Sequence, residues 1–361
     1  MTKNKVSSNS FFMLLYLSLL SSVFMYLSFS NVKVGTTDAV IRPLVFVVLI
    51  LLFSIPTLLV YKQYSKKGNI DKRSENKISF KIICILYGVV YFVAALRTLA
   101  RFDLFASSEL FPGSDMTFFI LFFIVVCGVL SRFGINALSR GAVIFLFVVV
   151  CATGFVTITL LNEVDMLNFT PFPENGVLPF LEDSFLFVVQ ATELGTIVLF
   201  LDEIEGDIKK NLGLWSILSG ISFAVILFFV VGSLGAFADT QLFPTYTAVT
   251  LANFGLLERV DALETAIWII CVVEKTSFYM LIVTKCVSKC LPKVKKIYIS
   301  GVVTAGLATI ILLVSNNVEK FRFVSYQPLI IGLFILGSVA LPLALYFYMK
   351  RVKTYEKKQD M

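Results

Sequence analysis

Long apolar runs, each ended by a short cluster of charged residues, recur along the whole of this chain. A helix that crosses a membrane needs about 20 apolar residues in succession, and several of the runs reach that length. A soluble domain could not bury so much apolar surface, since 58% of the 361 residues are hydrophobic and only 15% are charged. The sequence therefore predicts an all-α integral membrane protein that is in contact with membrane lipid.

We expect about ten transmembrane helices in a single domain that covers residues 1–361. The predicted spans are approximately residues 11–30, 40–60, 80–102, 116–131, 137–160, 183–201, 212–237, 261–284, 296–315 and 326–349. The first run follows Lys3 and Lys5, as the apolar part of a signal peptide would, but no small-residue cleavage site comes after it. Because further spans follow, we interpret it as a retained first helix.

The basic residues are distributed unequally between the two sides of these spans. Of the 31 Lys and Arg residues, 23 fall on the side that holds both termini and seven on the other, while Lys275 lies within a span. Cytoplasmic loops carry the excess of Lys and Arg, so both termini are predicted to be cytoplasmic. The net charge of +7 then reflects topology and not a surface for nucleic acid. The acidic outer loop at residues 162–183 is either a solvated segment or a docking or gating surface.

Several classes of chemistry lack the residues they need. The chain contains no histidine, which removes most histidine-based acid–base and zinc chemistry. Cys286 and Cys290 lie one helical turn apart at a lysine-rich end, and we interpret them as reduced structural thiols and not as a metal site. Phosphate loops, Rossmann glycines and nucleophile elbows are absent from the sequence. We therefore expect no catalytic residue, no metal and no cofactor.

Polar side chains inside the apolar runs are the functional candidates, because such groups are costly at membrane depth. The ligand or pathway candidates are Ser21, Ser22, Tyr91, Arg97, Arg101, Gln190, Thr192, Glu193, Gly195, Thr196, Glu274 and Lys275. Glu193 lies in the middle of the sixth predicted span, with Gln190 one helical turn before it. Gly195 would let the backbone open there and free polar groups for an amino acid, although Glu193 could also serve as a structural contact between helices.

The basic and aromatic candidates each have two interpretations. Lys275 is either a counter-ion for Glu193, or for groups near Glu274, across the bundle, or a side chain that extends toward the cytoplasmic face. Arg97 and Arg101 share one face at the outer end of the third span, where they could form a carboxylate-binding vestibule or anchor the helix at the interface. Tyr91 lines a pathway or packs against other aromatic side chains.

One block in the second half of the chain is unusual. Phe243-Pro244-Thr245-Tyr246 is followed by Phe254-Gly255-Leu256-Leu257-Glu258-Arg259-Val260-Asp261-Ala262-Leu263 and by Ile267-Trp268-Ile269. This block resembles the "P-T … G-x-(F/L)-(L/I)-E-R-(F/L)-(E/D)-(A/S)-(L/F) … W" pattern of the endospore germination permeases. These are the B subunits of GerA-type germinant receptors, within the amino acid–polyamine–organocation superfamily.

Three further segments are similar to that family. They are Gly134–Arg140 before the fifth predicted span, Asn168–Pro171 with Glu174–Gly176 in the outer loop, and Glu193 in the sixth span. The first helix departs from the family pattern, because residues 17–30 contain serines, among them Ser21 and Ser22, in place of a glycine-rich break. Serine hydroxyls can satisfy a locally unwound backbone.

The resemblance implies a five-plus-five inverted repeat of the leucine-transporter type and a permease-like domain in the spore inner membrane. It also implies germinant receptor A and C subunits as partners, a small nutrient such as an amino acid as ligand, and structural roles for Pro244, Glu258, Arg259 and Trp268. The favoured function is thus a nutrient-sensing subunit that triggers germination. The alternatives are a secondary amino-acid transporter of vegetative cells, a scaffold with a vestigial solute site, and a membrane-embedded enzyme.

Overall fold

The computed structural model describes residues 5–24, 36–67, 78–114, 116–169, 176–252, 260–314 and 317–359. The helices and strands are β1 Val6–Ser7, α1 Ser8–Phe24, α2 Thr37–Phe53, α3 Ile55–Lys67, α5 Ile78–Phe105, α6 Thr117–Arg132, α7 Gly134–Leu160, α8 Val177–Val188, β2 Ile204–Glu205, α9 Ile208–Leu234, α10 Pro244–Leu251, α11 Asp261–Cys290, α12 Lys296–Leu313, α13 Asn317–Ser325, α14 Gln327–Phe334 and α15 Leu341–Gln359. The π-helical turns are η1 Ala106–Leu110 and η6 Ile335–Ala340, and the 3-10 segments are η2 Leu161–Glu163, η3 Met166–Phe169, η4 Thr192–Phe200 and η5 Gly235–Thr240.

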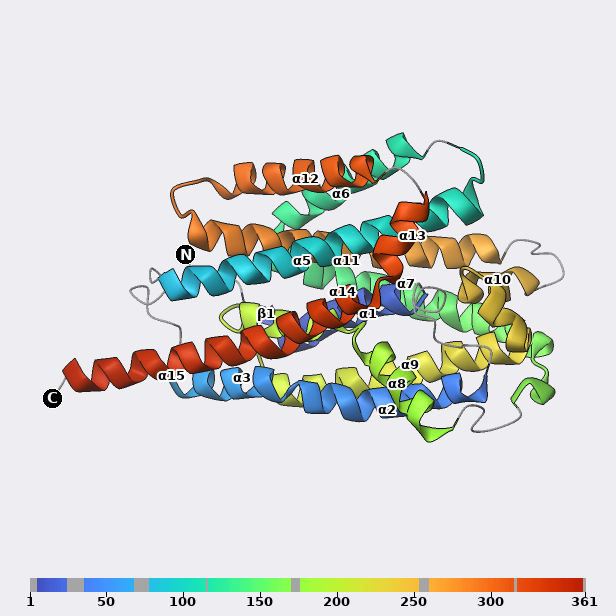
Figure 1. Cartoon of the computed structure of the whole chain (residues 1–361), viewed down its shortest axis with the longest axis horizontal. Coiled ribbons are helices and arrows are strands. Elements are labelled where there is room, and N and C mark those ends of the chain that lie inside the picture. The colour runs from blue at the N-terminus through green and yellow to red at the C-terminus, as the bar shows by residue number, and fades with distance from the viewer. Residues whose placement is uncertain are drawn as a thin grey trace.

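The long helices run side by side along the longest axis of the molecule (Figure 1). Helix α11 is central, because it packs against α1, α5, α6, α7 and α12. Helix α2 packs against α8 and α9, which places the two halves of the chain against each other. The single sheet in the described residues is small, with β1 paired in parallel to β2.

Length and composition support membrane spans for most of the long helices. Among the described residues, seven helices are long and apolar enough to cross a membrane, or up to eight if the bent pair α2 and α3 forms one span. Helices α1 and α6 are apolar but shorter, with 17 and 16 residues. The prediction of a multi-pass, all-α membrane protein is confirmed, whereas the count of ten spans stays a prediction.

The second predicted span is bent and not straight. Helices α2 and α3 meet at Ser54 with an angle of 41° between them. Pro56 follows closely, and a proline lacks the N–H that would continue the hydrogen-bond ladder. It also disfavours helical geometry at the preceding residue. At the bend the Ser54 hydroxyl donates to the Leu51 carbonyl oxygen at 2.7 Å.

Helices α6 and α7 are separated by one residue. Phe133 connects the two helices, and Gly134 has a φ of 81°, a left-handed conformation that glycine adopts at little cost. The fifth span therefore begins at Gly134 and not at residue 137. This sharp turn explains why the two apolar runs lie so close together in the sequence.

The sixth predicted span lies within the candidate membrane span Val177–Phe200, but this stretch is not one continuous α-helix. Helix α8 ends at Val188, the backbone at Gln190 and Ala191 is non-helical, and the 3-10 segment η4 begins at Thr192. Gln190 therefore does not lie one α-helical turn before Glu193. We predicted that the backbone opens at Gly195, but the break lies four to five residues earlier, at Gln190 and Ala191.

Other boundaries differ less. Helix α1 begins at Ser8, and residues 25–35, where the first predicted span ends, lie outside the described residues. The third span continues through η1 to Leu110. The seventh begins at Ile208, because the Asp207 side chain caps α9 by accepting from the Lys210 N–H at 3.1 Å. Helices α10 and α13 were not predicted.

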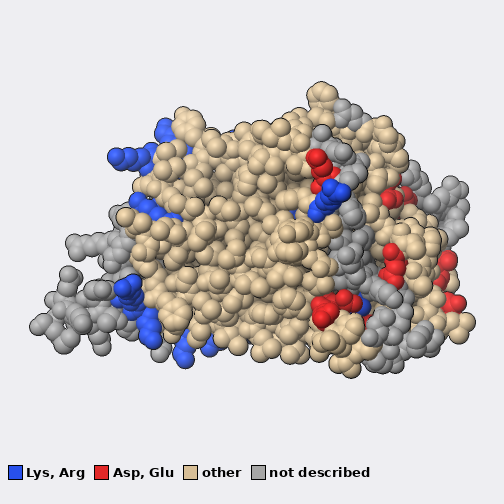
Figure 2. All heavy atoms as spheres, in the orientation of Figure 1, with Lys and Arg blue, Asp and Glu red and all other residues tan. Residues whose placement is uncertain are grey.

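Charge is separated along the same axis. Figure 2 shows most of the Lys and Arg residues of the visible face at one end, while Asp and Glu lie toward the other, where a few basic side chains accompany them. Figure 1 marks both chain ends on the basic side. The acidic side includes the exposed residues Glu163, Asp165 and Asp239.

The acidic loop between α7 and α8 does more than contact solvent. The Asn168 side-chain amide donates to the Gly232 carbonyl oxygen at 2.8 Å, and the Asp165 N–H donates to the same oxygen at 2.9 Å. A side chain at Gly235, whose φ is 51°, would collide with Asn168. The described part of the loop is thus fixed against the end of α9.

Candidate functional site

Glu193 is the most deeply buried carboxylate candidate, with none of its surface exposed. Segment η4 places it against α1 and α11. Its Oε1 accepts hydrogen bonds from the Ser18 hydroxyl at 2.8 Å and from the Tyr279 hydroxyl at 3.0 Å. The same oxygen lies 2.7 Å from the ammonium of Lys275. Its Oε2 is buried and has no hydrogen-bond partner among the described residues.

Lys275 is the counter-ion of Glu193. The side chain is buried in α11, and its Nζ also donates to the Ser18 carbonyl oxygen at 3.2 Å and to the Ser22 hydroxyl. A buried ammonium needs both a counter-charge and hydrogen-bond acceptors, because it has lost its water. The interpretation as a counter-ion is therefore confirmed, and the interpretation as a side chain that reaches the cytoplasmic face is wrong.

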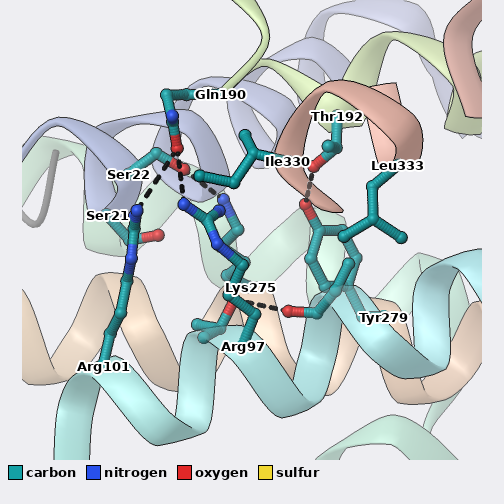
Figure 3. A pocket seen from close by; sticks show the side chains of 12 residues that line it. Ser21, Ser22, Arg97, Arg101, Gln190, Thr192, Lys275, Tyr279, Ile330 and Leu333 are labelled. Carbon is teal, nitrogen blue, oxygen red and sulfur yellow. Dashed lines mark hydrogen bonds between the residues drawn. The ribbon is translucent and has the colours of Figure 1, made fainter. Parts of the chain in front are cut away.

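Two arginines of α5 meet at a single amide oxygen. One Nη of Arg97 donates to Oε1 of Gln190 at 3.2 Å, and one Nη of Arg101 donates to the same atom at 3.5 Å. Figure 3 shows both side chains directed from one helix toward Gln190. Both residues are buried, with exposed fractions of 9% and 2%. They face the interior of the bundle and do not anchor α5 at the membrane interface.

These groups line one small cavity between α1, α5, α11, α14 and the α8–η4 break. The cavity is lined by Ser21, Ser22, Ala94, Arg97, Thr98, Arg101, Gln190, Thr192, Lys275, Tyr279, Ile330 and Leu333. The volume open to the centres of water molecules is about 10 Å³, which holds about one water. The cavity is therefore too small for a larger ligand in this structure, and binding of such a ligand requires its walls to move apart.

Tyrosine hydroxyls hold the broken backbone of this region in place. The Tyr91 hydroxyl donates to the Thr192 carbonyl oxygen at 3.0 Å. The Thr192 hydroxyl lies 2.7 Å from the Tyr279 hydroxyl, and since the Tyr279 proton goes to Glu193, Thr192 is the donor in this pair. A buried backbone carbonyl that has left a helix needs such a partner. These bonds connect the break to α5 and α11.

Gly195 allows two segments of backbone to touch. A Cβ atom at this position would lie 2.1 Å from the carbonyl oxygen of Gly337, which belongs to the π-helical turn η6. Thr196 donates its hydroxyl to the Glu193 carbonyl oxygen at 2.6 Å. Neither residue lines the cavity. Their position therefore supports the shape of η4 and not direct contact with a ligand.

Helix α14 forms one wall of the cavity, and α13 packs against α5 beside it. Nε of Arg97 donates to the Val324 carbonyl oxygen in α13 at 3.2 Å. Lys320 of α13 forms an ion pair with Asp103 of α5. Ile330 and Leu333 of α14 complete the wall. These contacts hold α13 and α14, which we call the cover, next to the two arginines.

Seven of the twelve candidates line the cavity. They are Ser21, Ser22, Arg97, Arg101, Gln190, Thr192 and Lys275. Glu193 and Tyr91 lie directly behind the wall, through their bonds to Lys275 and Thr192. Glu274 does not line the cavity, and its Oε1 has no hydrogen-bond partner among the described residues.

Two contributors were missed from the sequence. Ser18 and Tyr279 contact Glu193 directly, yet a serine or a tyrosine in an apolar helix is most often a packing residue. Spacing offered a weak signal, because Tyr279 follows Lys275 at i+4 and such residues share one face of a helix.

The residues of the sequence motif have structural positions where they are described. Pro244 is buried at the first turn of α10. Trp268 packs against Phe105, with ring centroids 3.7 Å apart, and against Phe243. Glu258 and Arg259 lie outside the described residues. Within the described ranges, no group of three or more Cys, Asp or Glu side chains could hold a metal.

Comparison with known proteins identifies the family. The sequence model of the family described as spore germination protein, the spore permeases, matches residues 5–321. A relative from Bacillus subtilis (strain 168), named "Putative spore germination protein YfkT", is 24% identical over 228 residues, which cover 62% of this chain and 62% of the relative. The chain thus aligns with less than two thirds of that relative's length. Because the family model extends over most of the chain, and over every helix that carries the cavity's charged residues, the chain belongs to the spore germination protein family.

Proposed function

We propose that this protein is the permease-like B subunit of a spore germinant receptor, and that it senses a small nutrient that carries both an amino and a carboxyl group. An amino acid is the simplest such nutrient. The observation that carries the proposal is the small cavity, in which Arg97, Arg101 and Lys275 lie next to a carboxylate with one unused oxygen.

The arrangement of charges fits a zwitterion. Arg97 and Arg101 both turn to the one amide oxygen of Gln190, whereas a ligand carboxylate would offer them two charged oxygens. Hydrogen bonds between guanidinium and carboxylate groups are about twice as strong as neutral ones. Once the walls have moved apart, a ligand ammonium would satisfy Oε2 of Glu193, which lies directly behind the wall. Polar recognition at both ends of a small molecule is what an amino-acid site requires.

Binding must open the cavity, and this supports a sensing role. A nutrient needs far more room than about 10 Å³, so the bound state differs from the one described here. The polar contacts of the cover formed by α13 and α14 include those of Arg97 and Lys320, which opening of the cavity would have to break. A ligand that binds only the open form shifts the population toward it. Partner subunits in contact with the protein would respond to this change in conformation.

The remaining expectations belong to the same proposal. Helices α1 and α6, added to the seven spans and the bent pair, give ten crossings and permit the five-plus-five inverted repeat. The basic end that carries both termini then faces the cytoplasm, in the inner membrane of the spore. The A and C subunits of the receptor are the expected partners.

Replacing Arg97 by Gln tests the ligand assignment. Hydrogen bonds to charged groups are worth about 1.5–3 kcal/mol, so the nutrient concentration for half-maximal germination is expected to rise about 10- to 100-fold. The measurement is dipicolinic-acid release from spores that carry the variant in place of the wild-type gene, across a panel of amino acids.

The matched control is Arg132→Gln. Arg132 contacts Ser300 and lies outside the cavity, so its dose–response curve is expected to match the wild type. Equal curves for the Arg97 and Arg132 variants, at equal protein abundance, would remove Arg97 from nutrient binding.

A further inference from the structure

A groove on the lipid-facing surface lies apart from the cavity described above. One face each of α1, α7 and α9 lines it, and it encloses about 640 Å³. The lining residues are Asn9, Phe12, Met13, Tyr16, Leu146, Val150, Asp207, Lys210, Asn211, Leu214, Trp215, Leu218 and Ser222. It is far larger than the small cavity of the candidate site and shares none of its residues.

The groove changes from polar to apolar along α9. Its polar end holds Asp207, Lys210 and Asn211, and the apolar walls follow at Leu214 and Leu218. From Lys210 to Ser222 the helix rises about 18 Å. The hydrocarbon core of a bilayer is about 30 Å thick, so the groove extends through about half of it. This matches the depth of one lipid leaflet, with the polar end at the lysine-rich side of the protein.

The walls are open to an apolar occupant. Val150, Leu214 and Leu218 are 56%, 49% and 47% exposed. The deep end is closed by the Tyr16 and Ser222 hydroxyls, which lie 2.5 Å apart. Because these two hydroxyls bond to each other, a bound molecule does not need to supply a polar group there. An acyl chain fits such a surface.

One residue that lines the groove has a buried polar group without a partner among the described residues. Trp215 lines it and is 2% exposed, and its Nε1 has no hydrogen-bond partner among the described residues. An indole N–H usually finds an acceptor when it is buried. The ester carbonyl of a glycerolipid is a hydrogen-bond acceptor that lies between the headgroup and the acyl chains. Trp215 has the corresponding position along α9, between Lys210 at the polar end and Leu218 in the apolar wall.

The polar end carries an excess of positive charge. Asp207 is already engaged, since it caps α9. A neighbouring cavity of about 570 Å³ shares Asp207 and is lined by Lys62 and Lys209. Three lysines therefore oppose one aspartate in the lining of the two adjoining spaces. An anionic headgroup fits this balance better than a zwitterionic one.

We propose that this groove is a binding site for one anionic phospholipid, with its phosphate at Lys210 and an acyl chain along α9. The occupant would contact the face of α1 that carries Phe12 and Tyr16. Ser18 and Ser22 of the same helix contact the buried ion pair. The lipid would therefore contact the helix that supports the candidate site. The proposal does not depend on the function proposed above.

Native mass spectrometry of the purified protein tests the site, with phosphatidylglycerol and phosphatidylcholine of identical chains as probes. The wild type is expected to retain phosphatidylglycerol preferentially. A lysine near a membrane surface contributes about a fivefold factor in the binding of an anionic lipid, so Lys210→Ala should lower phosphatidylglycerol retention about fivefold. Retention of phosphatidylcholine should fall less, because its choline group offsets the negative charge of the phosphate.

Filling the groove should remove the bound lipid. Leu218→Trp, and Val150→Trp on the opposite wall, are expected to abolish the retained adduct, whereas Val302→Trp on α12 should not. Val302 is 72% exposed and does not line the groove. Size-exclusion chromatography confirms that each variant is folded. Unchanged adducts in both filled variants would overturn the site, and equal retention of the two lipids by the wild type would overturn the headgroup assignment.

Discussion

Lys275→Met is expected to destabilise the protein by about 3–5 kcal/mol, the cost of removing one partner from a buried ion pair. The substitution leaves the carboxylate of Glu193 with no exposed surface and without its counter-ion. Thermal unfolding of the purified protein in detergent measures the loss. The double variant Glu193→Gln with Lys275→Met is expected to recover much of it, because a neutral pair has no charge to desolvate.

The single variant Glu193→Gln separates stability from function. A glutamine keeps an oxygen that accepts from Ser18 and Tyr279, so we expect the protein to remain in the membrane. Nutrient sensitivity should change, because the negative charge beside the cavity is lost. A normal dose–response curve would remove Glu193 from the mechanism. If the double variant were no more stable than Lys275→Met alone, the unpaired charge of Glu193 would not be the cause of the destabilisation.

Gly195→Ala is expected to prevent accumulation of folded protein. The added Cβ would meet a backbone oxygen at 2.1 Å, that of Gly337, and the hydroxyl of Tyr91 at 2.9 Å. Neither contact is relieved by turning a flexible side chain, because the closest atom is backbone and Tyr91 is fully buried. Segment η4 and the π-helical turn η6 would have to separate, and η4 carries Glu193.

The matched control is Gly154→Ala in α7. A Cβ at Gly154 meets nothing within 4 Å, and alanine favours a helix by about 0.8–1 kcal/mol over glycine. Fluorescence-detected size-exclusion chromatography of tagged variants measures both outcomes. We expect a normal or stronger monodisperse peak for the control. A similar peak for the Gly195 variant would show that the contact with Gly337 is looser than described.

The helical, membrane-embedded fold could be predicted from the sequence, because a bilayer requires long apolar segments and leaves few alternatives. The breaks were harder to predict. The bend at Ser54 had a signal in Pro56, which cannot donate to the helix ladder. The break at Gln190 and Ala191 had none, since neither residue is a proline or a glycine. It is stabilised from outside, by the hydroxyls of Tyr91 and Tyr279.

The sequence revealed as site candidates those groups whose burial costs the most free energy. Charges such as Glu193, Lys275 and Arg97 were identified because they are expensive at membrane depth. Ser18 and Tyr279 were missed because their burial costs little and only a partner reveals their role. Sequence could place Arg97 and Arg101 on one face of a helix. It could not show that this face turns inward, since that depends on the packing of α13 and α14.

Nutrient-triggered release of dipicolinic acid from spores with this gene cleanly deleted tests the central claim most directly. The account predicts that release in response to one amino acid, within a panel of them, is lost on deletion and restored by complementation with the wild-type gene. Complementation with Arg97→Gln should restore it only at higher concentrations of the same amino acid. Unchanged release for every nutrient, in a strain without other germinant receptors, would contradict the account and favour a transport function, which uptake of radiolabelled amino acids would then measure.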